Sequence, residues 1–275
     1  MILRRTGIAA LVVSISLGMT SNVLFLAAFQ FRFDRFFEPT RVVASGATPA
    51  ELVRWAAVLD LFGYYLATAV LAYVLWRQLR PRNPLIADLS TMAAVGYALA
   101  GGVGAAVLAM VAPMLMHNYT DATAAGQPLI AAQFAVVLQV VWRAIWQFLD
   151  AILLAAWWLG IGWLLRGDRS RLSRLSLVLA AAAAAGAVAN IAGLSLVRDV
   201  LLGVLFVLWT AWWISLCVIY ARQNKQLPPF SRRNRRTASG RTRKTASPGW
   251  LPCWIARGSN PSAGGDAEAF AGGLP

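Results

Sequence analysis

The sequence is poor in the residues on which many catalytic and metal sites depend. Its 275 residues include two cysteines and one histidine, and 13% are charged. Cys217 lies in an apolar run and Cys253 in a polar segment, without CxxC spacing, so no disulfide framework is indicated. His117 is the single histidine, which argues against a histidine-based metal centre. We therefore expect no cofactor and no metal.

Familiar catalytic motifs are also missing. The chain contains no HExxH, no GxSxG and no Walker loop. His117, in "HNYTDAT", is a candidate general base, but a lone histidine at a membrane interface is more often simply solvated. The sequence gives no positive indication of an enzyme, and we expect a non-enzymatic role.

Apolar residues are abundant. They make up 59% of the chain, whereas a soluble domain is about half apolar and a quarter charged. A run of about 20 apolar residues is long enough to cross the hydrocarbon of a bilayer. The sequence therefore predicts an all-α fold, a polytopic transmembrane helix bundle in contact with the lipid bilayer. We expect six spans, at about 6–31, 52–79, 85–116, 128–165, 175–196 and 200–220.

The last part of the chain differs in composition. We divide the chain into a transmembrane domain, 1–222, and a tail, 223–275, which is rich in Arg, Ser, Gly and Pro and predicts disorder. Ten basic and two acidic residues from Ala221 onward carry +8 of the net charge of +14. The tail could bind anionic lipid or could be solvated without a role. Because the body is much less basic, we expect no nucleic-acid partner.

Basic residues predict the orientation of the bundle. Arginines gather before the first span, between the second and third, between the fourth and fifth, and in the tail. Lys and Arg accumulate on the cytoplasmic side, so we expect both termini in the cytoplasm. The first loop opposes this trend with several arginines. Arg4 and Arg5 before an apolar run also resemble a signal peptide, but no clear cleavage site follows.

Two local patterns concern single spans. In "TPAEL", Thr48 is a candidate cap and Glu51 could reach back to it, which predicts a helix start. Gly96, Ala100 and Gly104 recur every four residues in the third span. Such faces let helices approach closely in lipid, although small residues are common throughout this chain.

The fourth span carries an unusual polar stripe. In "QVVWRAIWQFLDA", Gln139, Arg143, Gln147 and Asp150 share one face if each residue advances about 100°. Tryptophans on both sides, including Trp157 and Trp158, predict the interfaces and place Asp150 inside the hydrocarbon. Arg143 could snorkel to the surface, whereas the short Asp150 side chain should face protein or trapped water.

The second span supplies a possible companion to this stripe. Asp60 should lie at a similar height in the outer half, and Tyr64 follows one turn later. Ionisable groups inside spans usually face the bundle interior and suggest a functional site. Three alternatives stay open: a structural ion pair with Arg143, a ligand or solute pocket that opens outward, and a proton relay through Asp60 and Asp150.

The layout of the chain resembles a large family of bacterial six-span integral-membrane proteins of unknown function. The resemblance lies in the arginines before the first helix, the acid in "AAVLDLFGYYLA", the polar fourth span and the short connection between the last two spans. It covers residues 1–222 and implies the cytoplasmic membrane of a bacterium as the location, with no reaction to carry over. We expect a protein for binding, sensing or assembly, or alternatively a small-solute or proton-coupled transporter.

Overall fold

A computed structural model describes residues 2–32, 38–168 and 171–225. The chain divides into two compact units, Met1–Leu227 and Pro228–Pro275. The second unit lies outside the described residues, and so does nearly all of the tail predicted at 223–275. The described helices all belong to the first unit.

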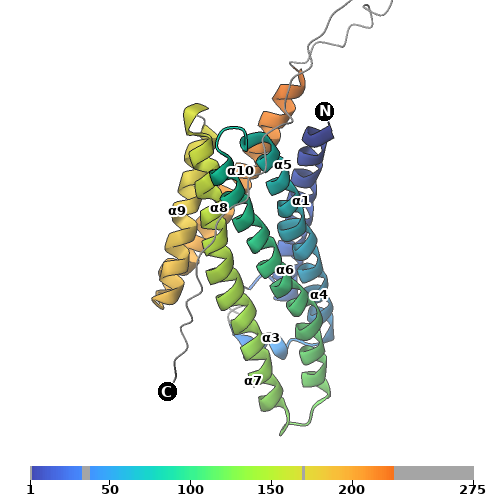
Figure 1. The fold of residues 1–275 in the computed structure, drawn as a ribbon. Coiled ribbons are helices and arrows are strands. Elements are labelled where there is room, and N and C mark those ends of the chain that lie inside the picture. Colours follow the sequence, from blue (N-terminus) through green and yellow to red (C-terminus); the bar gives the residue numbers. More distant parts are fainter. Residues whose placement is uncertain (1, 33–37, 169–170, 226–275) are drawn as a thin grey trace, which may run out of the picture. The chain divides into compact units, whose positions relative to one another are not determined.

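The described residues are helical and contain no strand, which confirms the all-α prediction (Figure 1). Six helices are long and apolar enough to cross a membrane, and their bounds differ from the predicted ones by a few residues. The elements are α1 (Ile2–Ala28), α3 (Pro39–Val43), α4 (Ala47–Asp60), η1 (Leu61–Leu66), α5 (Ala67–Leu79), α6 (Pro84–Asp121), α7 (Gln127–Leu138), η2 (Gln139–Leu149), α8 (Asp150–Leu164), η3 (Arg166–Asp168), α9 (Arg171–Ile191) and α10 (Ser195–Lys225).

Two spans contain a segment of π-helix. The second span runs continuously through α4, η1 and α5, and the fourth through α7, η2 and α8. The Ala67 N–H donates to the Phe62 carbonyl oxygen and the Asp150 N–H to that of Ile145, in each case five residues back. π-Helices are rare and are often found at functional sites.

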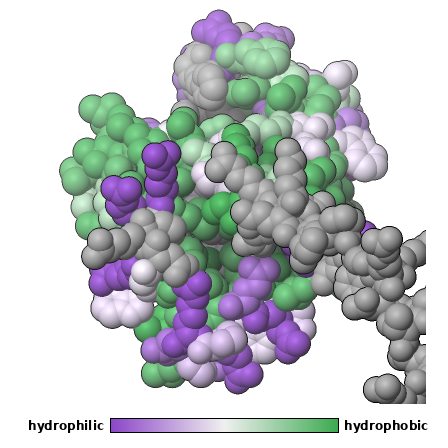
Figure 2. Space-filling model, turned by 90° about the horizontal axis from the view of Figure 1, so that it is seen from above, coloured by the Kyte–Doolittle hydropathy of each residue, from purple (hydrophilic) through white to green (hydrophobic). Residues whose placement is uncertain are grey.

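The start of α1 and the end of α10 lie at the same end of the bundle. The Arg4 guanidinium donates to the Tyr220 carbonyl oxygen, and the Tyr220 hydroxyl donates to Gln78 Oε1 over 3.1 Å. Arg82 Nη1 reaches the Leu164 carbonyl oxygen at 3.0 Å, which joins the α5–α6 connection to the end of α8. Hydrophilic residues gather around an apolar interior at this end (Figure 2).

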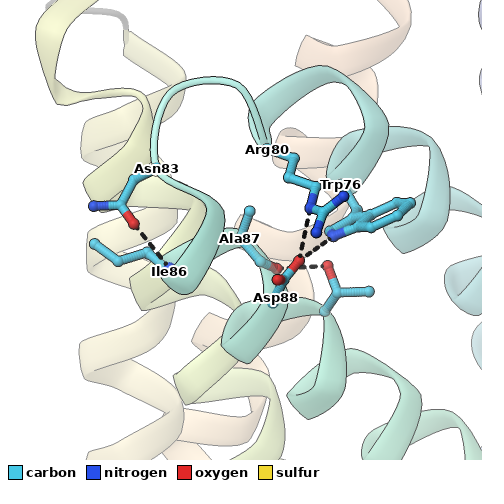
Figure 3. Close-up of polar contacts among 7 residues, drawn as sticks. Trp76, Arg80, Asn83, Ile86, Ala87 and Asp88 are labelled. Carbon is cyan, nitrogen blue, oxygen red and sulfur yellow. Dashed lines mark hydrogen bonds and ion pairs between the residues drawn. The ribbon is translucent and has the colours of Figure 1, made fainter. Parts of the chain in front are cut away.

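The α5–α6 connection is fixed by a small polar cluster (Figure 3). Asn83 caps α6, because its side-chain oxygen accepts from the Ile86 N–H at 3.1 Å, and Pro84 suits the first turn. Asp88 Oδ1 accepts from Trp76 Nε1 at 2.6 Å and lies 3.3 Å from Arg80 Nε. These contacts hold the ends of two spans together where the chain reverses direction.

The start of α4 differs from the sequence-based prediction. Gly46, with φ of 97°, is the N-cap residue, and Thr48 lies inside the helix without a capping hydrogen bond. A glycine adopts this left-handed conformation without the steric cost that a Cβ atom would bring. The helix therefore begins earlier than the capping motif around Thr48 predicted.

The buried apolar residues form two clusters at different heights. One contains residues from α1, η1, α5, α6, α8, α9 and α10, such as Leu71, Trp158 and Trp212. The other joins the end of α1 to α3, α4, α6, α7 and η2, and includes the fully buried Val43 and Met116. A helix of 38 residues, such as α6, is about 57 Å long, whereas hydrocarbon is about 30 Å thick. The long helices therefore bury apolar residues in two clusters along their length and not in one.

Candidate functional site

A cavity of about 210 Å³ lies between α1, the end of α4, η1, α6, η2, α8, α9 and α10. Most of its wall is apolar, with a few polar side chains among the aromatic rings. The polar and charged residues that line it are Asn22, Asp60, Tyr64, Tyr65, Tyr97, Gln147, Asp150 and Arg198. A mostly apolar cavity with a small number of placed polar groups is typical of a site for a small molecule.

Asp150 lies at the point where η2 passes into α8. Its side chain is buried, at 3% exposure, and Oδ2 accepts a hydrogen bond from the Tyr65 hydroxyl over 3.2 Å. Oδ1 is buried without a hydrogen-bond partner among the described residues. Asp150 therefore presents one bonded and one unbonded oxygen in the region of the cavity.

Asp60 lies just before η1 and is also buried, at 8% exposure. Its one side-chain hydrogen bond in the described part of the chain is long, 3.5 Å from Ser21 Oγ to Asp60 Oδ1. Ser21 also donates to the Ala56 carbonyl oxygen at 2.8 Å, which is the better bond. One turn later, the Tyr64 hydroxyl accepts from Asn22 Nδ2 at 2.7 Å.

Gln147 has the least satisfied side chain on the cavity wall. It is 6% exposed, and both Nε2 and Oε1 are buried without a hydrogen-bond partner among the described residues. Buried polar atoms usually have a partner, and each exception needs an explanation. A bound molecule or water in the cavity would supply the missing donor and acceptor.

Close approach of α6 makes this arrangement possible. A Cβ atom at Gly101 would lie 2.0 Å from Tyr65 Cε1 and 2.4 Å from Asp150 Oδ2. Further along α6, Gly96 faces Leu153 and Gly104 faces Trp146. The small-residue face of the third span thus packs against the fourth span and leaves room for the Tyr65–Asp150 pair.

Aromatic rings form a continuous cluster on one side of the cavity. Tyr64 contacts Trp209 with a centroid distance of 5.5 Å, and Tyr97 lies 5.0 Å from Tyr65 and 6.0 Å from Trp209. Behind Trp209 the cluster continues to Trp158, at 5.2 Å. Such pairs add to the stabilisation that burial of their area provides, so this wall is well packed.

The two tryptophans used to predict the inner interface belong to this buried cluster. Trp157 and Trp158 are almost fully buried and stack at a centroid distance of 6.0 Å. Their use as interface markers is therefore wrong. Trp163, by contrast, is exposed, and the Arg166 guanidinium lies 4.3 Å from its ring centroid.

The structure brings only part of the polar stripe to the cavity. Gln147 and Asp150 line it together with Asp60 and Tyr64 from the second span. Gln139 and Arg143 are exposed and lie outside the lining. The stripe assumed 100° per residue, but a π-helical turn holds more residues than an α-helical one. Each residue of η2 therefore rotates by less than 100° about the helix axis. As a result, Gln139 and Arg143 at the start of the stripe do not face the cavity.

Arg143 takes part in the structure through its backbone. Its carbonyl oxygen accepts from Asn190 Nδ2 over 3.0 Å, which ties the end of α9 to η2. The structural ion pair with Arg143 that the sequence left open is absent from the described residues. Asn190 itself lies outside the cavity lining, so this contact is structural.

Several lining residues were missed by the sequence reasoning. Arg198 at the start of α10 is buried, lines the cavity and donates from Nε to Asp199 Oδ1 at 2.8 Å. Tyr65, Tyr97 and Trp209 give no signal in a single sequence, because aromatic residues occur in most spans. Asn22, a polar residue deep in the first apolar run, was the one signal that could have been used.

The two acidic side chains on the cavity wall have no basic partner among the described residues. Neither Asp60 nor Asp150 forms an ion pair with a described Lys, Arg or His side chain. Arg198, the basic residue on the wall, is paired with Asp199. The two carboxyl groups within the bundle therefore have no counter-charge on the described part of the protein.

Metal-binding and histidine chemistry find little support in the part of the chain that the structure describes. No group of three His, Cys, Asp or Glu residues there could hold a metal ion. His117 lies near the far end of α6, where its Nε2 is 3.5 Å from Glu51 Oε1, and it does not line the cavity. The cavity itself offers two carboxyl groups, two amides, one guanidinium group and aromatic rings.

Comparison with family models, with curated proteins and with solved structures found no match. The resemblance of the chain to a six-span bacterial family therefore stays a prediction.

Proposed function

We propose that this chain is a multi-pass membrane protein that binds a small molecule in the cavity between its spans, in a binding, sensing or assembly role without catalysis. The observation that carries the proposal is Gln147, whose amide has two buried atoms without a hydrogen-bond partner in the described structure. Leaving a buried polar group unsatisfied costs about 1–3 kcal/mol. A bound molecule that offers one acceptor and one donor would remove that cost.

The size of the cavity supports the same conclusion. Its volume is about 210 Å³, whereas one water in the liquid occupies about 30 Å³. It has room for several waters or for one small organic molecule. Since most of the wall is apolar, an organic molecule with one polar end satisfies the wall better than water alone.

The proposed setting is the cytoplasmic membrane of a bacterium, with both termini in the cytoplasm. Asp60 lies 19 residues before Leu79, about 28 Å along the helix. Arg80 and Arg82 come just after Leu79, the end of the second span, and would mark the cytoplasmic face of the membrane there. On this orientation the cavity lies in the outer half of the bundle and takes its ligand from the outer side.

A cavity-filling variant tests the proposal. A Cβ atom at Gly186, on the wall, would meet nothing closer than Leu201 Cβ at 4.0 Å. Leucine there should fold and fill part of the space. Gly203→Leu on α10 is the matched control, because its surroundings are open and it does not line the cavity.

The full chain and both variants would be purified in mild detergent, and the small molecules released on denaturation would be measured by mass spectrometry. We expect one compound to accompany the wild type and Gly203→Leu in near-stoichiometric amount, and to be strongly depleted in Gly186→Leu. Equal amounts of every compound in all three preparations would contradict a ligand in this cavity.

Transport is the second candidate function, because Asp60 and Asp150 lie inside spans and carboxyl groups there are often part of proton or solute pathways. The compound found by extraction would be offered to proteoliposomes with and without a pH gradient. Uptake that depends on the gradient would establish transport. Saturable binding without flux would leave a binding or sensing role.

A further inference from the structure

We propose that the ligand of this cavity is a small organic cation, held between the carboxyl groups of Asp60 and Asp150 and the surrounding aromatic rings. The inference rests on the proposed function, because it names the chemical class of the bound molecule. Three independent features of the cavity lead to it: the missing counter-charge, the aromatic wall and the unbonded acceptor atoms.

The first feature is the charge. Asp60 and Asp150 have no ion-pair partner among the described residues, and the charge of Arg198 is offset by Asp199. A buried carboxyl group without a basic partner either keeps its proton or binds a cation, because an isolated charge is costly to remove from water. A cationic ligand would stabilise the carboxylate form of Asp60 and Asp150, whereas an anionic ligand would be repelled by it.

The second feature is the wall. Six residues with Tyr or Trp rings line the cavity: Tyr64, Tyr65, Tyr97, Trp142, Trp146 and Trp209. The face of such a ring attracts a cation, and aromatic cages are a recurrent way to bind quaternary ammonium groups. Apolar substituents on the cation would pack on the same rings.

The third feature is the set of unbonded polar atoms. Asp150 Oδ1 and Gln147 Oε1 are acceptors, and Gln147 Nε2 is a donor, without partners in the described part of the protein. The acceptors suit an ammonium N–H or hydroxyl group, and the donor suits a ligand oxygen. A wholly apolar ligand would leave all three atoms unsatisfied, which argues against it.

The cavity has an exposed side. Leu202 and Phe206 of α10 line it and are exposed at 41% and 40%. Asn22 and Phe25 of α1, also part of the lining, are half-buried. A cation with apolar groups could therefore enter beside α10 without passing through the packed core around Trp158.

Choline and 3,3-dimethylbutan-1-ol provide a matched pair of probes. They have the same shape, but the quaternary nitrogen of choline is replaced by carbon in the alcohol, which removes the positive charge. Both are small enough for the cavity and both carry a hydroxyl group. Binding of each to the full chain in detergent would be measured by isothermal titration calorimetry.

We expect choline to bind at least tenfold more tightly than the neutral alcohol. Asp60→Asn and Asp150→Asn should each weaken choline binding by tenfold or more and leave the alcohol nearly unaffected. Asp121→Asn, at the exposed end of α6, is the control and should change neither affinity.

The outcomes separate this inference from the proposed function. If the alcohol binds as tightly as choline, the cavity accepts small molecules but does not select cations, and the inference is overturned. If neither probe binds while the extraction experiment yields an uncharged compound that Gly186→Leu depletes, the cation is excluded and the binding function stands. If both experiments are negative, both proposals are overturned.

Discussion

The Tyr65 hydroxyl donates a hydrogen bond to Asp150 Oδ2 over 3.2 Å and so connects the second span to the fourth inside the bundle. The two residues are 85 positions apart in the sequence and meet where α6 carries a glycine instead of a side chain. Their contact joins the two π-helical segments, because Tyr65 belongs to η1 and Asp150 follows η2. The geometry of the cavity depends on this contact.

The first prediction concerns Gly101. In Gly101→Ala the new methyl group would lie 2.0 Å from Tyr65 Cε1 and 2.4 Å from Asp150 Oδ2, so both side chains must move. Overpacking of a core costs about 1–3 kcal/mol. We expect a lower unfolding free energy in a denaturation titration, together with weaker ligand binding.

Gly203→Ala is the control for this variant. Nothing lies within 4 Å of the new methyl group, and alanine favours a helix over glycine by about 1 kcal/mol. We therefore expect this variant to be as stable as the wild type or more stable. Equal stability changes in Gly101→Ala and Gly203→Ala would mean that α6 does not approach the Tyr65–Asp150 pair as described.

The six helices of the fold follow from the sequence with little ambiguity. Apolar runs of the required length are separated by short polar connections, and a segment such as α9, with its run of alanines, has no other way to bury its backbone polar groups in lipid. The local start of α4 was harder to predict. The capping motif at Thr48 competed with Gly46, whose left-handed conformation is invisible in the sequence.

The candidate site was accessible to sequence reasoning only in part. Asp60 and Asp150 stand out because acids are costly inside spans, and both line the cavity. Arg143 was linked to them on the assumption of regular α-helix, which the π-helical winding of η2 invalidates. The aromatic side of the site, such as Trp209, depends on packing between distant spans and has no signature in one sequence.

A second prediction addresses the folding role of Asp150. Asp150→Asn keeps an oxygen that can accept from Tyr65 but removes the carboxyl group, which has no ion-pair partner among the described residues. If the acid serves a ligand, the empty protein should be at least as stable after the change, because a desolvated charge is costly without a partner. Thermal unfolding of ligand-free protein would measure this.

The contrasting result would support a structural role. Loss of a buried, paired charge typically costs about 3–5 kcal/mol. A decrease of that size in Asp150→Asn would show that the carboxylate is paired in the folded protein. It would therefore contradict the inference that Asp150 lacks a counter-charge. Asn22→Ala, which removes a polar lining residue without a charge, provides a comparison.

A third prediction concerns the cluster at the α5–α6 connection. Asp88→Asn should retain the acceptor for Trp76 Nε1 and lose the ion pair with Arg80, which is partly exposed. Exposed ion pairs contribute about 0–1 kcal/mol, so the change should be small. Asp88→Ala also removes the hydrogen bond, and we expect it to cost about 1 kcal/mol more. Equal stability of the two variants in a denaturation titration would contradict a role for the Trp76 contact.

The fourth prediction is the pH dependence of choline binding. Choline has a permanent positive charge, so only the protein can change its charge with pH. Protonation of Asp60 or Asp150 removes the negative charge that attracts the cation, and the affinity for choline should therefore fall as the pH is lowered. If each choline displaces one proton, the limit is a tenfold loss for each pH unit. Titration calorimetry at a series of pH values would measure the slope, and binding of 3,3-dimethylbutan-1-ol should stay constant.

The groups around the two acids make this a test of the carboxyl groups themselves. Tyr65 and Tyr97 face Asp150, Ser21 and Tyr64 face Asp60, and none of them acquires a positive charge; Arg198 on α10 is the basic residue of the lining. His117, the only histidine, lies outside the cavity lining, and His117→Gln should retain the full pH dependence. A slope that disappears in His117→Gln but persists in Asp150→Asn would assign the titration to the histidine and contradict the carboxylate site.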